Sequence, residues 1–109
     1  MNQDAKPTGL AAGDVLVSSW GYDQTNVDFY KVVGPAEVGK FCQLVKVGQK
    51  YVSGDHWSGT VVAVPEDVIG RPFKKKVKAS PYHGACVKIA SYAHATPWDG
   101  KPQSQTGYA

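Results

Sequence analysis

Residues 13–33 read GDVLVSSWGYDQTNVDFYKVV and carry the clearest structural signal in the chain. The segments 14–20 and 27–33 are rich in β-branched and aromatic residues, which favour β-strands. Residues 21–26 between them are mostly of types that are frequent in turns. The pattern therefore predicts a β-hairpin.

Short segments of the same kind continue along the chain at 40–47, 60–64, 73–79 and within 83–93, and a further short strand is possible at 50–52. Clusters of Gly, Pro and Ser separate them, and residues 66–70 could form one helical turn. The predicted fold class is all-β. We expect a small antiparallel barrel or bent sheet, SH3-like in preference to OB-like, with at most one short helix.

A chain of 109 residues is the size of one domain. Residues 1–12 show no periodicity and are predicted to be a flexible lead-in, so that residues 13–109 form a single small barrel domain. The alternating pattern of the strands predicts a core of apolar side chains. Its predicted members are Val15, Val17, Val27, Phe29, Val33, Leu44, Val45, Val62, Val64, Val77, Val87 and Ile89.

Composition excludes several classes of protein. Hydrophobic residues make up 42% of the chain and charged residues 19%, which is typical of a folded domain and not of a disordered chain. No apolar run approaches the ~20 residues that span a bilayer, and the first residues lack the features of a signal peptide. We therefore expect a cytoplasmic protein, in which Cys42 and Cys86 are reduced and buried.

Positive charge is concentrated in one segment. The net charge is only +3, but five of the twelve basic residues lie within residues 71–78, which contain no acid. Strand periodicity places Lys74, Lys76 and Lys78 on one face, and we call these three residues the lysine row. Together with Arg71 and Lys75 beside it, the row is suited to the phosphates of nucleic acid. The alternative is an exposed edge strand, on which lysines prevent aggregation.

The predicted hairpin is dense in flat and hydrogen-bonding side chains, which could stack on a base or contact a protein partner. A structural interpretation competes with this one, because such residues also satisfy turn backbone groups and cap cores. The candidate stacking or partner-contact residues are Trp20, Tyr22, Asp23, Gln24, Asn26 and Tyr30, with Trp57 from a later loop.

Catalytic and metal signatures are weak. His83 and Cys86 form one imperfect ligand pair, whereas structural zinc sites usually combine two close pairs. We predict no metal, no cofactor and no catalytic residue. A small-barrel ribonuclease would need dispersed groups, here His56, His83, Arg71 and either Asp23 or Asp28, and it stays open as an alternative.

The block SWGYDQTNVDFY at 19–30 and the tail WDGKP at 98–102 resemble a pattern shared by small uncharacterised proteins of bacteriophages and plasmids. The resemblance implies that the protein comes from a mobile element and acts inside a bacterial cell. It implies no activity and no site residue. The strand opening at 13–17, GDVLV, is also similar to that of small-barrel ribonuclease toxins.

The leading hypothesis is a binding module without enzymatic activity that contacts nucleic acid through the lysine row and the hairpin aromatics. Two alternatives are kept: a module that binds a host bacterial protein through the hairpin, and a ribonuclease-type toxin. No membrane partner is expected, and either a monomer or a homodimer is possible.

Overall fold

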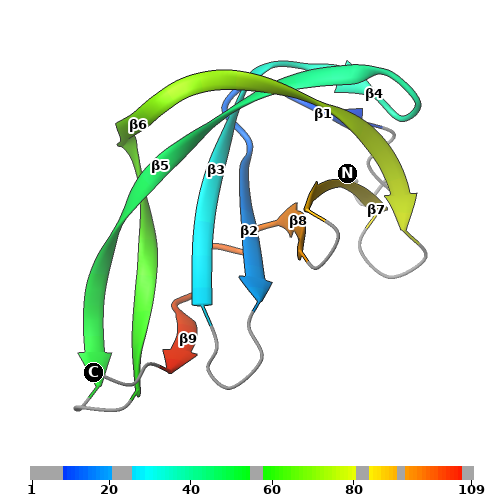
Figure 1. Cartoon of the computed structure of the whole chain (residues 1–109). Helices are drawn as coiled ribbons and strands as arrows, with labels where there is room; N and C mark the ends of the chain where they lie inside the picture. Colours follow the sequence, from blue (N-terminus) through cyan, green and yellow to red (C-terminus); the bar gives the residue numbers. More distant parts are fainter. Residues whose placement is uncertain (1–8, 21–25, 55–57, 81–83, 91–92, 107–109) are drawn as a thin grey trace, which may run out of the picture.

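The computed structural model describes residues 9–20, 26–54, 58–80, 84–90 and 93–106, and in these residues the regular structure is entirely β (Figure 1). Among these residues no helix is present that could cross a lipid bilayer. The strands are β1 (Gly9–Leu10), β2 (Val15–Trp20), β3 (Asn26–Gly34), β4 (Ala36–Glu37), β5 (Phe41–Gly54), β6 (Ser58–Ser80), β7 (Gly84–Ala90), β8 (Ala93–Pro97) and β9 (Gln103–Thr106).

Six of these strands close into an antiparallel barrel. In the order β2, β3, β5, β6, β7 and β8, each strand pairs with the next, and β8 returns to pair with β2. The prediction of an all-β antiparallel barrel is confirmed. This order is a meander without a crossing connection, which separates it from the Greek-key OB-fold.

The barrel interior is the first of two cores. Side chains from all six barrel strands meet there, and β1 adds Leu10. The ring of Tyr30 packs edge-on against Phe73, with 5.8 Å between ring centroids. The buried members of this core are Leu10, Leu16, Tyr30, Val32, Cys42, Leu44, Val77, Ala85, Val87 and Ala95.

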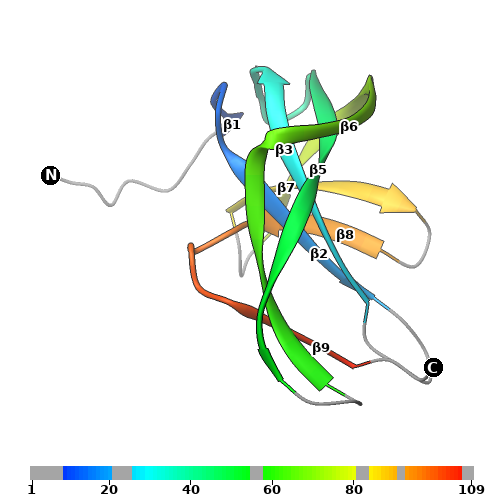
Figure 2. The ribbon, with the colours of Figure 1, turned by 90° about the vertical axis from the view of Figure 1, so that its left-hand side faces the viewer.

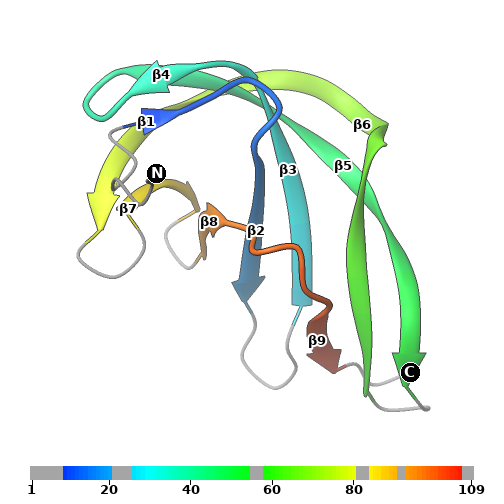
Figure 3. The same ribbon diagram turned by 180° about the vertical axis from the view of Figure 1, so that it is seen from behind.

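A second core lies on the outer face of β2, β3 and β5. The later half of β5 and the earlier half of β6 extend beyond the barrel as a two-stranded arm, and β9 pairs with β6 in this arm (Figures 1 and 3). Val61 and Ala63 of the arm pack with Val27 and Phe29 of β3. The rotated view in Figure 2 shows β9 beside the arm. Trp98 covers this core, with its ring 5.2 Å from that of Phe29.

The two cores explain where the predicted core was wrong. Val15 and Val17 face the second core and are only half-buried, while the residue between them, Leu16, points into the barrel. Val33 is 42% exposed, and its neighbour Val32 is buried instead. The prediction assumed one buried face for each strand, and a sheet covered on both faces does not follow that pattern.

Two local predictions also need correction. Residues 66–70 form no helical turn but belong to β6, where the register with β5 shifts twice and Gly70 has a φ of 80°. Such irregularities bend a strand, and they occur where β6 leaves the arm and enters the barrel. Residues 9 and 10, which were predicted to belong to the flexible lead-in, form β1, which pairs with β4 and buries Leu10.

The tail at 98–102 forms a local turn that connects distant strands. The Asp99 carboxylate accepts a hydrogen bond from the Lys101 amide at 2.9 Å, and the Trp98 indole donates to the Lys101 carbonyl at 2.8 Å. An Asp-Gly pair suits a tight hairpin turn, but the strands on either side of this one do not pair with each other, since β8 pairs with β2 and β7 whereas β9 pairs with β6. The turn therefore positions Trp98 over the second core.

Replacing Leu16 with Ala should lower the free energy of unfolding by about 2–5 kcal/mol, because a fully buried side chain would leave a cavity in the barrel. Val33→Ala should change it by less than about 0.5 kcal/mol, as an exposed site does. Urea unfolding monitored by circular dichroism measures both values. Equal losses in the two variants would contradict the assignment of strand faces.

Replacing Trp98 with Ala should lower the free energy of unfolding by about 2–3 kcal/mol, below the usual range for a fully buried Trp because Trp98 is half-buried. Trp98→Phe keeps a ring against Phe29 and should lose less than half of that amount. The same urea measurement tests this prediction. A Trp98→Ala variant as stable as the parent protein would contradict the inference that packing of Trp98 on the second core stabilises the fold.

Candidate functional site

The lysine row lies on the outer face of the barrel. Lys74, Lys76 and Lys78 are exposed, whereas Phe73 and Val77 on the same strand point toward the barrel core. The predicted alternation along this segment is therefore confirmed. Alternate residues of a strand lie about 6.6 Å apart, so the row presents three ammonium groups in line.

The strand that carries the row pairs with different strands along its length. Lys74 and Lys76 lie in the stretch of β6 that pairs with β5, and Lys78 lies in the stretch that pairs with β7. In Figure 1 this part of β6 arches over the top of the barrel. The pairing of β6 with β7 begins only at Val77, so the other edge of β6 beside Lys74 and Lys76 has no described strand paired with it. The explanation that lysines protect an exposed edge therefore still applies at these two positions.

Neighbouring strands add further groups to the outer face. Phe41 is paired with Lys76 across β5 and β6, and Gln43 is paired with Lys74. On the far side, Lys88 of β7 and His94 of β8 are exposed and paired with one another. None of these four residues was predicted from the sequence as a contact residue, although each lies next to a buried residue in its strand.

Lys75 does not belong to the row. It points to the opposite side of β6, and its Nζ donates a hydrogen bond to the Ile89 carbonyl at 3.2 Å. The pairing of β6 with β7 ends at Val77, and β7 has an irregular register with β8 beside Ile89. The ammonium group thus supplies a hydrogen-bond donor to a backbone oxygen just beyond the end of the β6–β7 pairing. Lys75 therefore has a structural contact in place of the predicted phosphate contact.

Arg71 is exposed in the irregular stretch of β6 before the row. Within the described part of the chain, none of the three row lysines forms an ion pair. The acids of β6, Glu66 and Asp67, precede Arg71, whereas residues 71–80 carry five basic residues and no acid. The charge of the row is therefore not neutralised by described neighbours.

The hairpin strands use their polar groups inside the fold. The Trp20 indole donates to the Asp28 carboxylate at 2.8 Å, and the other oxygen of that carboxylate lies 3.3 Å from the Lys46 ammonium. Tyr30 is 7% exposed and belongs to the barrel core, so the prediction that it makes stacking contacts is wrong.

Trp20 is half-buried, and Asn26 is half-buried and paired with it across β2 and β3. The remaining predicted contact residues, Tyr22, Asp23, Gln24 and Trp57, lie outside the described residues.

The cysteines are buried, as predicted. Cys42 faces the barrel core and donates a weak hydrogen bond to the Lys75 carbonyl at 3.4 Å. Burial raises the pKa of both the Cys42 and the Cys86 thiol, which keeps them protonated and poorly nucleophilic at neutral pH. The histidines of the ribonuclease alternative, His56 and His83, lie outside the described residues.

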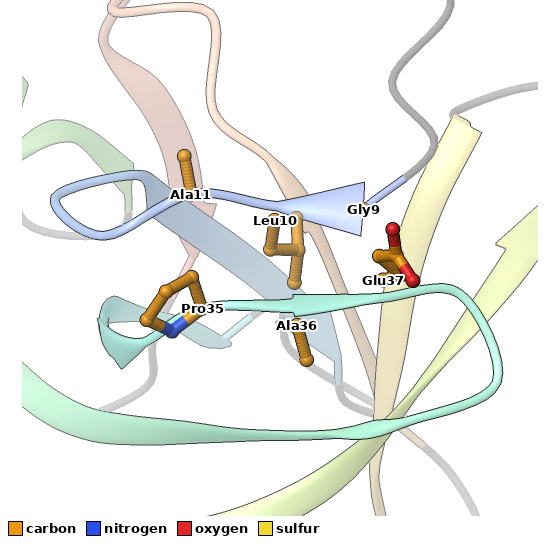
Figure 4. Close-up of a pocket in the computed structure, with 6 residues that line it drawn as sticks. All are labelled: Gly9, Leu10, Ala11, Pro35, Ala36 and Glu37. Atoms are coloured by element: carbon orange, nitrogen blue, oxygen red, sulfur yellow. The ribbon is translucent and has the colours of Figure 1, made fainter.

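A pocket of about 360 Å³ lies between β1 and β4 (Figure 4). Figure 4 shows Leu10 on one strand and Pro35 and Ala36 on the other, with the Glu37 carboxylate at one end. A side chain at Gly9 would collide with the Ala36 carbonyl, only 2.5 Å from the position of its Cβ, so the strands approach closely. The apolar lining, with one carboxylate, provides no pair of groups for acid–base chemistry.

Comparisons of the chain with protein-family models, with curated proteins and with solved structures find no match. Among the described residues, the outer face of β5, β6 and β7 near the lysine row combines positive charge without ion pairs and the exposed aromatic ring of Phe41.

Replacing Lys75 with Met should lower the free energy of unfolding by about 1 kcal/mol, because the Ile89 carbonyl loses its donor. Lys76→Met removes the same charge from the outer face and should change stability by less than about 0.5 kcal/mol. Urea unfolding of the two variants gives the comparison. The assignment of Lys75 to the inner side would be wrong if Lys76→Met were the more destabilising change.

Proposed function

We propose that this protein binds nucleic acid through the lysine row and acts without catalysing a reaction. The observation that carries the proposal is the placement of Lys74, Lys76 and Lys78 on the outer face of a strand that is paired within the barrel. Edge protection is a competing explanation for Lys74 and Lys76, but the row lysines are exposed and form no ion pair with a described residue, so their charge is available for a ligand. Phosphate oxygens require positive charge and little geometry, which a row of lysines provides.

The surroundings of the row support a polyanionic partner. No described acid forms an ion pair with the row, and Lys88 and His94 extend the same face. Salt bridges at an exposed protein surface are weak, so a single acidic side chain would gain little from this face. A nucleic acid strand presents many phosphates at once and releases counterions when it binds.

The alternative of a protein partner depended on the hairpin aromatics. Two of these have partners within the fold, since Trp20 donates to Asp28 and Tyr30 packs on Phe73. The hairpin strands therefore support the structural interpretation of these residues more than a contact surface. Of the groups that the ribonuclease alternative needs, Arg71 and Asp28 are described, and the Asp28 carboxylate already has Trp20 and Lys46 as partners.

The proposed setting is the cytoplasm of a bacterial host, with a bacteriophage or plasmid as the source. This part of the proposal rests on the resemblance of the blocks at 19–30 and 98–102 to proteins of mobile elements. Trp98 gives the second block a structural reason to persist, because it covers the second core.

Replacing Lys74 and Lys76 with Gln should weaken binding to nucleic acid and make it less sensitive to salt. The slope of log affinity against log salt should decrease in magnitude by about 1.5, because each phosphate contact contributes about 0.7–0.9. Fluorescence anisotropy with a labelled oligonucleotide, repeated at several salt concentrations, measures the slope.

The matched control is Lys50→Gln with Lys101→Gln, which removes the same charge from two exposed positions outside the row. This control should retain the parent slope. If both double variants lose affinity equally, the binding reflects net charge and the lysine row is not its site.

A further inference from the structure

Phe41 is the most exposed large hydrophobic residue of the described chain, at 65%. It begins β5, and the next residue, Cys42, is fully buried in the barrel core. Strand alternation therefore holds the Phe41 side chain on the outer face. The ring makes no contact with another described aromatic ring.

The position of Phe41 relative to the lysine row is set by the pairing of β5 with β6. Phe41 lies directly opposite Lys76, and Gln43 lies directly opposite Lys74. Directly opposite residues on one face have Cβ atoms about 5 Å apart. An aromatic ring and an amide therefore form a second row beside two of the lysines.

This arrangement distinguishes between forms of nucleic acid. Lysine contacts to phosphate do not discriminate strongly between single and double strands, whereas an aromatic side chain stacks on a base whose face is open. In a duplex each base is covered by its neighbours, so a ring can reach a base face only after the bases are unstacked, which costs a few kcal/mol per step. An unpaired base can stack on Phe41 without that cost.

We infer that this face binds single-stranded nucleic acid, with the backbone along Lys74, Lys76 and Lys78 and a base stacked on Phe41. The inference rests on the proposed function and specifies its partner. Gln43 beside the ring can donate to or accept from the edge of the stacked base. DNA and RNA share the backbone charge and the base faces, so both satisfy the same contacts.

The test compares labelled oligothymidine, oligouridine and a duplex of matched length, about 12 nucleotides or base pairs, within the usual site sizes. Each is titrated with the full-length protein in fluorescence anisotropy at low salt. Tighter binding of either single strand than of the duplex is expected. Preference between the two single strands would identify the sugar that the face accepts.

Phe41→Ala should weaken binding to the single strand by about fivefold or more and leave the salt slope unchanged, since the lost contact is uncharged. Phe41→Trp should retain the affinity. Tyr51→Ala removes another exposed aromatic, on the arm, and should have no effect. Equal urea midpoints for the variants would show that each one is folded.

The outcomes separate this inference from the proposed function. If the duplex binds as tightly as the single strands and Phe41→Ala has no effect, while Lys74→Gln with Lys76→Gln loses affinity, the single-strand inference is overturned and the lysine row stands. If the parent protein binds none of the three probes at low salt, the proposed function itself is overturned.

Discussion

The structure depends on burying both faces of one strand at the same place. Phe29 and Tyr30 are consecutive in β3, so their side chains leave the sheet on opposite sides. Phe29 packs against Trp98 in the second core, and Tyr30 packs against Phe73 inside the barrel. A barrel alone would leave the Phe29 side in water. The arm of β5 and β6, the turn at 98–102 and β9 together provide the second cover.

Much of the barrel could be predicted from local sequence, because its strands alternate between apolar and polar residues. The predicted strands were too short, however, since β5 has 14 residues and β6 has 23, and each combines two predicted segments. The second core could not be predicted, because its members come from segments that only the folded chain brings together. Val15 and Val17 looked like barrel residues for this reason, and Leu16 was overlooked. A consecutive apolar run such as 15–17 is the signal of a strand covered on both sides.

The candidate site, too, could be predicted from local sequence only in part. Alternation along 73–78 was sufficient to predict that Lys74, Lys76 and Lys78 share a face. It could not show that Phe41 lies beside Lys76, because that neighbour is set by pairing between β5 and β6. The aromatic residues of the hairpin were more conspicuous in the sequence than Phe41. In the structure, Tyr30 serves the barrel interior and Trp20 hydrogen-bonds to Asp28.

The meander order determines when each strand edge of the barrel becomes paired during synthesis. Five of the six strand pairs of the barrel join barrel strands that are consecutive along the chain. The sixth pair joins β2 to β8, where Leu16, Val17 and Ser18 pair with residues 95–97. During synthesis β2 can pair with β3 early, yet its other edge stays open until β8 has left the ribosome. An open edge is a template for pairing with other chains. The nascent protein is therefore most prone to aggregate just before β8, the last of the six barrel strands, arrives.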